Sequence, residues 1–267
     1  MIESLKIGSI TCDFLTPDDF NGWCSQRLSG TTLSHVITLN PEMIMEAQTN
    51  QAFREALKAA SLRVPDGSGL VWARWYLRSA FWSLWPSLLA FPFIHAQRVT
   101  GVDAVVSIAQ LAEKTNKTIY LLGGTAYQSG LTAKFLSTKF PTLKIHTSPS
   151  HKYVSRGPES ILREIEIQQP DIVLVAYGAP KQTLWIRGNK DRLKGVKLIV
   201  GVGGAFAILS EDKPRAPYWL RRLNLEWLWR LLLEPKRLPR IWRATISFPL
   251  LINRQKLKDE ITAGDWV

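Results

Sequence analysis

The residue best suited to chemistry in this chain is Asp66, in the run Val64-Pro65-Asp66-Gly67-Ser68-Gly69. The run places a single carboxylate in a turn rich in glycine and proline, directly after a short apolar segment. A carboxylate on a tight turn that is at least half-buried is a natural general base. Asp66 is therefore the candidate catalytic residue.

Three later apolar runs, each predicted to be a strand, also end in glycine-rich turns. These turns contain Gly123, Gly124, Gly178, Gly201 and Gly203. A single turn of this kind is usually only a tight left-handed connection. Three of them at the strand ends of one sheet favour a crevice in which backbone N–H groups bind phosphate. A lone acid beside such a crevice indicates transfer chemistry on a nucleotide-activated substrate, with these glycines as nucleotide-binding candidates.

Several other catalytic motifs are missing from the sequence. The glycine pattern that begins at Gly201 has Phe206 where the dinucleotide-binding fingerprint has its third glycine, and no acid follows at the spacing of a ribose contact. The chain has no P-loop pattern, no Gly-x-Ser-x-Gly pattern and no plausible catalytic Cys/His pair. A nucleotide-sugar oxidoreductase or epimerase is thus a weaker alternative, and covalent hydrolysis is disfavoured.

Neither a metal nor an organic cofactor is predicted. The four histidines are scattered without ligand spacing, and the chain has no Asp-x-Asp pair of the kind that holds a divalent ion on a nucleotide diphosphate. Cationic side chains are expected to neutralise the diphosphate instead. The candidates are Arg98 and Arg215, although a single arginine is more often a solvated surface residue.

Three uncharged polar residues complete the set of substrate-binding candidates. Thr38 and Asn40 leave the end of a predicted strand just before Pro41. Asn before Pro commonly starts a turn, so a purely structural role competes with ligand binding. Gln182 opens a helix after an apolar strand, and either caps that helix or contacts the ligand.

The elements that must position these residues alternate between strand and helix. Predicted strands cover residues 34–39, 62–64, 118–122, 143–146, 171–177 and 196–200. Predicted helices cover residues 42–60, 70–77, 103–114, 128–140, 158–168 and 182–193. This alternation, with strongly apolar strands, predicts an α/β fold: a mostly parallel, Rossmann-like sheet with helices on both faces.

The basic charge of the chain is concentrated at its C-terminal end. The formal net charge is +12, and residues 213–256 hold eleven Lys or Arg against two acids. In residues 218–233, Trp and Leu follow one face and arginines lie nearer the other, as in an interfacial helix. A terminal helix docked on the core is an equal alternative. We expect an α/β catalytic domain at 1–210 and a basic helical appendage at 211–267.

Charge confined to one segment indicates an anionic partner, either lipid or nucleic acid. The Trp/Leu face favours an anionic membrane surface over nucleic acid. Cys12 and Cys24 lie far from any C-x-x-C spacing, which favours a reduced, cytoplasmic chain. No signal peptide is recognised, and no apolar run has the roughly 18–20 residues of a spanning helix. The nearest run, residues 80–94, is interrupted by prolines and could still enter a membrane interface.

Motifs spread along nearly the whole chain carry a resemblance to a known family. They are Thr38-Leu39-Asn40-Pro41, Val64-Pro65-Asp66-Gly67-Ser68-Gly69, Arg98-Val99-Thr100-Gly101, Leu121-Leu122-Gly123-Gly124, Gly178-Ala179-Pro180-Lys181-Gln182, Gly201-Val202-Gly203-Gly204, Arg215-Ala216-Pro217 and Leu225-Glu226-Trp227-Leu228-Trp229-Arg230. In this order they resemble the WecG/TagA/CpsF glycosyltransferases, glycosyltransferase family 26.

The resemblance implies a bacterial inverting transferase that uses a UDP-activated N-acetylmannosamine-type sugar. It implies an N-acetylglucosamine on a polyprenyl diphosphate as acceptor, in cell-surface polysaccharide synthesis. Asp66 matches the family's proposed base, while Thr38, Asn40, Arg98 and Gln182 match its other polar motif positions. The basic appendage matches a segment proposed to sit on the membrane and close the site. We therefore expect a peripheral protein on the inner face of the plasma membrane; its oligomeric state, including a homo-oligomer, stays open.

The chain departs from the family pattern in two places. The stretch between Trp72 and Arg98 is longer and more aromatic than is usual in the family. The loop around residues 146–153 lacks the consecutive histidines and the glycine often found there.

Overall fold

The computed structural model describes residues 2–79, 84–91, 94, 98–147 and 158–264. Its centre is a six-stranded sheet in the order β4-β3-β8-β7-β5-β6, and every neighbouring pair is parallel. The strands are β3 (Ser34–Leu39), β4 (Leu62–Pro65), β5 (Thr118–Gly123), β6 (Lys144–Thr147), β7 (Ile172–Ala176) and β8 (Leu198–Gly201). The predicted α/β class is confirmed.

A separate antiparallel hairpin, β1 (Glu3–Ile7) and β2 (Ile10–Phe14), precedes this sheet. The helices of the α/β part follow the chain in the order α1 (Pro17–Leu28), α2 (Pro41–Thr49), α3 (Gln51–Lys58), α4 (Ser68–Arg78), α5 (Leu84–Leu89), α6 (Gly101–Lys114), α7 (Ala126–Lys139), α8 (Pro158–Gln168), α9 (Lys181–Asn189) and α10 (Ala205–Leu209). The hairpin and α1 were not predicted.

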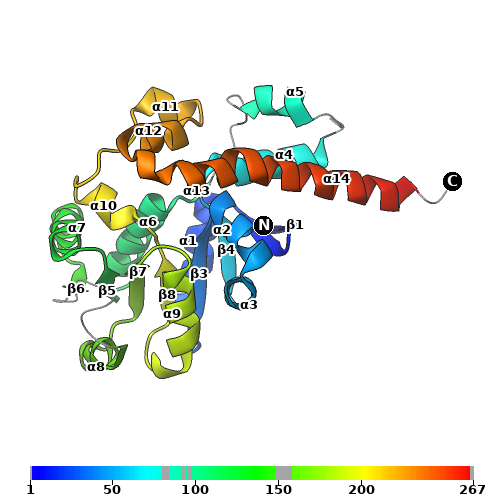
Figure 1. Ribbon diagram of the computed structural model, residues 1–267. Coiled ribbons are helices and arrows are strands. Elements are labelled where there is room, and N and C mark those ends of the chain that lie inside the picture. Colours follow the sequence, from blue (N-terminus) through cyan, green and yellow to red (C-terminus); the bar gives the residue numbers. More distant parts are fainter. Residues whose placement is uncertain (1, 80–83, 92–93, 95–97, 148–157, 265–267) are drawn as a thin grey trace.

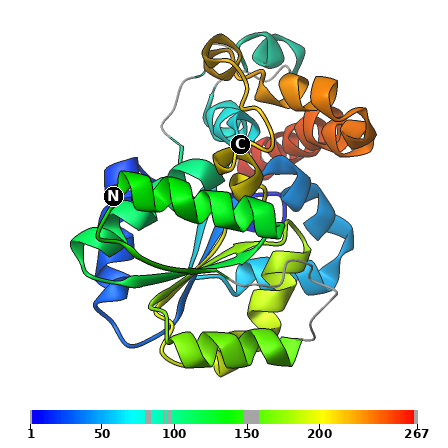
Figure 2. The ribbon, with the colours of Figure 1, turned by 90° about the vertical axis from the view of Figure 1, so that its left-hand side faces the viewer.

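Helices cover both faces of the sheet because its strands are apolar on both sides (Figures 1 and 2). In β7, Ile172 and Leu174 belong to the core beneath α1, α6, α7 and α10. Val173 and Val175 point to the opposite core beneath α8 and α9. Successive side chains of a strand alternate between faces, so a fully apolar strand needs cover on both.

The predicted helix over residues 42–60 is two helices, because Asn50 interrupts it. Asn50 has extended backbone angles, and its side chain accepts the backbone N–H of Phe53 to cap α3. An asparagine that bonds backbone in this way favours a helix start over a helix interior. The other predicted helices and strands of the sheet were located correctly, with ends that shift by a few residues.

The C-terminal appendage is helical, as predicted, but its first helix is broken. It contains α11 (Tyr218–Arg222), α12 (Glu226–Leu233), α13 (Leu238–Trp242) and α14 (Phe248–Gly264). Residues 218–233 do not form one helix because Asn224 has a φ of 60°. A π-helical segment, Arg243–Ser247, joins α13 to α14 in one long rod, which crosses above the sheet in Figure 1.

The rod is anchored to the α/β part by packing and hydrogen bonds. Phe248 and Ile252 of α14 lie in the core that also contains Ile37 and Leu39 of β3. The Tyr76 hydroxyl donates to Asn253 Oδ1 at 2.6 Å. Helix α14 is therefore part of the folded body, and the domain boundary at residue 210 stays a prediction. Within the described residues, no helix has both the length and the apolar composition needed to cross a bilayer.

Candidate active site

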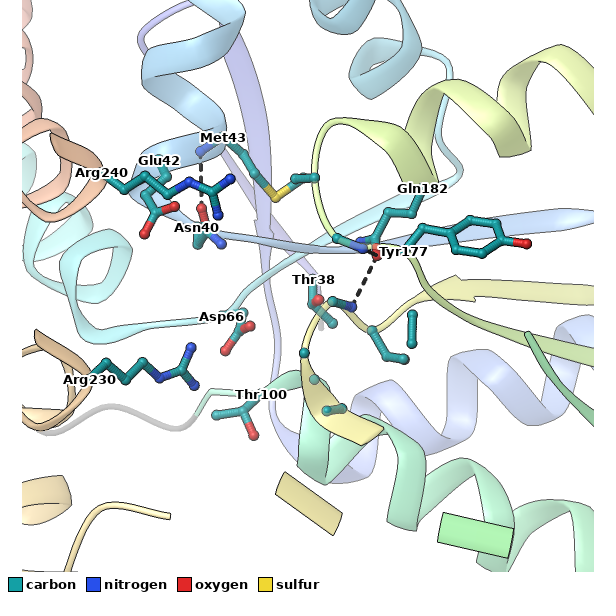
Figure 3. Close-up of a pocket in the computed structure, with 18 of the residues that line it drawn as sticks. Thr38, Asn40, Glu42, Met43, Asp66, Thr100, Tyr177, Gln182, Arg230 and Arg240 are labelled. Atoms are coloured by element: carbon teal, nitrogen blue, oxygen red, sulfur yellow. Dashed lines mark hydrogen bonds between the residues drawn. The ribbon is translucent and has the colours of Figure 1, made fainter. Parts of the chain in front are cut away.

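A cavity of about 440 Å³ lies where the carboxyl ends of β3, β4, β7 and β8 meet the appendage (Figure 3). Asp66 follows β4, Tyr177 and Gly178 follow β7, and Val202 and Gly203 follow β8; all five line the cavity. Ligands of open parallel sheets bind at this edge, where the strand order reverses.

Asp66 is held in place by backbone contacts on two sides. Its N–H donates to the Leu39 carbonyl at 2.6 Å, which ties the turn to the neighbouring strand. Its carboxylate receives a hydrogen bond from the Gly101 backbone at the first turn of α6. Gly67 then takes a φ of 116°, a conformation that glycine adopts without strain, and α4 begins.

Burial raises the pKa of Asp66 to about 6, and the neighbouring Glu226 carboxylate adds to the rise. The cations Arg230 and Arg98, together with the Gly101 hydrogen bond, oppose it. The net effect is a carboxyl group that is mainly ionised at neutral pH but much more basic than an ordinary aspartate. A catalytic base is most effective when its pKa lies near the working pH.

Gly101 is required by the close approach of two elements. A Cβ at this position would lie 2.7 Å from the Val202 carbonyl oxygen in the turn after β8. The absence of a side chain lets the start of α6 press against that turn. The positive end of the helix dipole is thereby brought next to the Asp66 carboxylate.

Gln182 is buried and acts as a brace between two strand-end turns. Its Oε1 accepts the N–H groups of both Gly178 and Gly203, each at 3.1 Å. Its side chain also packs against Gly201, where a Cβ would lie 2.7 Å from Nε2. Gln182 therefore fixes the geometry of the turns that line the cavity, in addition to lining it.

Thr38 and Asn40 line the same cavity and also have structural partners. The Thr38 hydroxyl donates to the Gly201 carbonyl at 2.9 Å. The Asn40 Oδ1 accepts the N–H of Met43 at 3.0 Å and caps α2. Both interpretations of Asn40 thus stay open, since a capping residue can still present its amide group to a ligand.

The predicted nucleotide-binding glycines separate into two groups. Gly178 and Gly203 line the cavity, whereas Gly123, Gly124 and Gly201 are not among its lining residues. Gly201 is covered by Gln182, and Gly123 lies against the β7 backbone, where a Cβ would be 3.0 Å from the Ala176 carbonyl carbon. The turns after β7 and β8 are therefore the ones that reach the cavity, and nucleotide binding by any of these glycines stays a prediction.

The appendage supplies most of the positive charge of the cavity. Its lining arginines are Arg215, Arg230, Arg237, Arg240 and Arg243. Arg230 bonds Glu226 at 2.8 Å within α12, and Arg215 lies 3.6 Å from Asp103. Figure 3 shows Arg230 directed toward Asp66, and Arg240 reaching past Glu42 toward Asn40. Sequence reasoning identified Arg215 alone, because only the tertiary fold shows which tail arginines reach the strand ends.

A second cavity, of about 460 Å³, adjoins the first. The residues that line both are Asn40, Glu42, Asp66, Thr100, Glu226, Arg230 and Arg237. Arg98 lines the second cavity but not the first. Asp66 thus stands where two cavities meet, and the predicted diphosphate contact Arg98 lies on the far side of it.

The described side chains form no cluster of three or more His, Cys, Asp or Glu that could hold a metal ion. The five arginines of the appendage that line the first cavity, Arg215, Arg230, Arg237, Arg240 and Arg243, are groups that bind anions. This fold and cavity define an enzyme of the open parallel α/β class.

Sequence comparison identifies the family. The pattern of the glycosyl transferase WecG/TagA/CpsF family matches residues 5–261. A protein of Staphylococcus aureus (strain MRSA252), named N-acetylglucosaminyldiphosphoundecaprenol N-acetyl-beta-D-mannosaminyltransferase, is 31% identical over 206 residues, 77% of this chain and 74% of its own. The protein of that name in strain NCTC 8325 / PS 47 is 30% identical over the same shares. The chain belongs to the WecG/TagA/CpsF family of glycosyl transferases.

Proposed function

We propose that this protein is an inverting hexosyltransferase of bacterial cell-surface polysaccharide synthesis. It moves an N-acetylmannosamine-type sugar from a UDP-sugar to an N-acetylglucosamine carried on a polyprenyl diphosphate. Membership of the family and the names of the staphylococcal relatives support the sugar and the acceptor. The observation that carries the proposal is the position of Asp66 at the junction of two cavities, since a transferase must bring two substrates to one base.

The donor would occupy the first cavity, with its diphosphate among the arginines of the appendage. The N–H groups of Gly178 and Gly203, in the turns after β7 and β8, already donate to Gln182 Oε1, so the arginines would make the main contacts with the diphosphate. Arg215 and Arg240 are on the same cavity wall and add charge-assisted contacts. These cations would stabilise the UDP leaving group as negative charge develops on it.

In the transfer step, a hydroxyl of the acceptor attacks the anomeric carbon of the donor sugar. The new glycosidic bond forms as the bond to UDP breaks, and the hydroxyl proton passes to Asp66. A single displacement inverts the anomeric centre. The pKa of about 6 suits Asp66 to this role, because the base is ionised at neutral pH and still accepts a proton.

The protein would work on the inner face of the plasma membrane, bound through the rod of α13 and α14. An apolar stripe follows the exposed side of this rod: Leu238, Trp242, Leu250, Leu257 and Ile261. Arg254 and Lys258 of α14 are also exposed, so the rod carries cationic as well as apolar side chains on its surface. This composition favours an anionic lipid surface over nucleic acid, which offers no apolar phase to the stripe.

The experiment that tests the proposal is a panel of UDP-sugars offered with a polyprenyl-diphosphate-linked N-acetylglucosamine. UDP release and the disaccharide product are both measured. We expect turnover with UDP-N-acetylmannosamine, its loss in Asp66→Asn, and its retention in Asp191→Asn, an exposed acid outside both cavities. A protein that binds NAD and oxidises or epimerises the UDP-sugar without an acceptor would refute the proposal.

A further inference from the structure

The second cavity changes character along its length. At the junction with the first cavity, the two cavities share the charged side chains of Glu42, Asp66, Glu226, Arg230 and Arg237, whereas Arg98 lines the second cavity alone. Away from the junction its walls are apolar: Trp72, Leu88, Phe91, Trp227, Ile241 and Phe248. A cavity with arginines at a charged mouth and an apolar interior matches a ligand that has an anionic head and a hydrocarbon tail.

Part of the apolar wall comes from the aromatic stretch in which the chain departs from the family pattern, and the rest comes from α4 and the appendage. Helix α5 and the turn that follows it supply Leu88 and Phe91. The indole N–H of Trp72 donates to the Ser87 carbonyl at 3.1 Å and fixes α5 to α4. On the other side, Asn224 Nδ2 donates to the carbonyls of Phe91 and Ile94, at 3.0 and 3.2 Å.

These hydrogen bonds make the cavity a formed site between the stretch, the appendage and the α/β part. Asn224 is buried and has a φ of 60°, an unfavourable backbone conformation for a residue other than glycine. In this conformation its side-chain amide links the appendage to the aromatic stretch. Helices α5 and α12 thus stand on the same side of the sheet, above the rod, as Figure 1 shows.

We propose that the second cavity holds the first isoprene units of the acceptor's polyprenyl chain. This inference rests on the proposed function and assigns a role to the aromatic stretch. The order of groups in the acceptor is sugar, diphosphate and prenyl chain. In the cavity, Asp66, Arg230 and Arg237 lie at the junction, whereas Arg98 and the apolar wall belong to the second cavity alone, so the acceptor hydroxyl reaches the base when the chain enters the apolar end.

The size of the cavity limits what it holds. At about 460 Å³ it is within the range of sites for small molecules, roughly 300–1,000 Å³. It therefore accommodates only the start of a long polyprenyl chain. The remainder would stay in the membrane, against which the exposed stripe of the rod lies.

The test uses three soluble acceptors below their aggregation limit, without detergent: N-acetylglucosaminyl diphosphate bearing a farnesyl, a dodecyl or a methyl tail. We expect a KM for the farnesyl acceptor at least about tenfold below that for the methyl acceptor, because each buried methylene strengthens binding about fourfold. The dodecyl acceptor should bind less well than the farnesyl one, whose branched units fill a wall of aromatic side chains. Equal KM values for farnesyl and dodecyl tails would overturn the isoprenoid assignment.

Two variants alter the second cavity by different means. Ala244→Trp fills it and Leu88→Ser makes its wall polar; either should remove most of the farnesyl preference and leave the KM for the UDP-sugar unchanged. The matched controls are Ala52→Trp and Ile167→Ser, both exposed and outside the cavity. If one cavity variant does not fold, the other gives the result; a farnesyl preference that survives in a folded cavity variant would overturn the assignment.

Calorimetric binding of farnesyl diphosphate separates this inference from the proposed function, because this ligand carries no sugar. Binding that is weakened by both cavity variants would support the assignment even if no sugar were transferred. Transfer without a tail preference, and without farnesyl diphosphate binding, would overturn the assignment and leave the transferase intact.

Discussion

Replacing Asp66 by asparagine should abolish transfer and make the protein more stable. The asparagine keeps the shape of the side chain and can still accept the Gly101 hydrogen bond, but it cannot take a proton. Burial and Glu226 disfavour the ionised carboxylate in the folded protein. The ionised Asp66 therefore lowers the folding stability of the wild type, and the neutral asparagine removes this destabilisation.

The size of the gain follows from the pKa. Folding raises the pKa of Asp66 from 3.8 to about 6, roughly two units, and each unit corresponds to about 1.4 kcal/mol. The asparagine variant should therefore gain up to about 3 kcal/mol at pH 8. For a chain of this size that is an increase in Tm of up to about 6–12 °C. Solvent in the cavity screens part of the effect, so these values are upper bounds.

The sign with pH is definite. The folded wild type holds the Asp66 proton more tightly than the unfolded chain, so its stability falls as pH rises from about 4 to about 6. The difference in Tm between the variant and the wild type should be small at pH 4, grow over that window and stay constant above pH 7. In the wild type, kcat/KM should fall below about pH 6, as the free enzyme's base becomes protonated.

Thermal unfolding across pH and single-turnover transfer give the two measurements. A Tm difference that does not change with pH would mean that Asp66 titrates normally in the fold. Near-wild-type transfer by the asparagine variant would exclude Asp66 as the base. Either result would refute the reasoning, and the first would do so even if the variant were inactive.

Three further predictions concern the metal, the polar contacts and the appendage. Transfer should survive a strong chelator; a large loss restored by manganese or magnesium would contradict direct neutralisation by arginines. Gln182→Ala should raise the KM for the UDP-sugar by loosening two turns, and Arg98→Ala should raise the KM for the prenyl acceptor; unchanged kinetics in both would mean that these contacts are misplaced. Trp242→Ser with Leu250→Ser should weaken co-sedimentation with anionic vesicles at least about tenfold and leave transfer to a methyl-tailed acceptor intact; unchanged vesicle binding would show that the stripe does not face lipid.

The sheet could be predicted because its signal is local. Continuous apolar runs such as β3 and β7 are buried on both faces, and their ends are marked by Gly, Pro or Asn. The β1–β2 hairpin was missed although Gly8, with a φ of 59°, stands in its two-residue turn. Its first strand is half exposed and short, so its alternation was too weak to stand out from a loop.

The residues of the site also fall into those that the sequence could locate and those that it could not. Thr38 lies near the carboxyl end of β3, and Asn40, Asp66 and Gln182 follow strands; parallel strands bring their carboxyl ends together at one edge, so the proximity of these residues could be predicted. The arginines of the appendage could not be chosen from the sequence. Eleven basic residues lie between positions 213 and 256, and only the fold of α12 and of the rod decides which of them face Asp66.

The rod also changes what a truncation experiment can show. Removing the appendage would take Phe248 and Ile252 from the core and expose Ile37 and Leu39 of β3, so loss of activity in a truncated chain would report unfolding as readily as loss of membrane binding. The same helix presents Trp242 and Leu250 outward and lines both cavities from within. One element thus carries the core contact, the cavity wall and the exposed stripe on different faces. Membrane attachment and completion of the active site can therefore be separated only by substitutions on single faces of this rod.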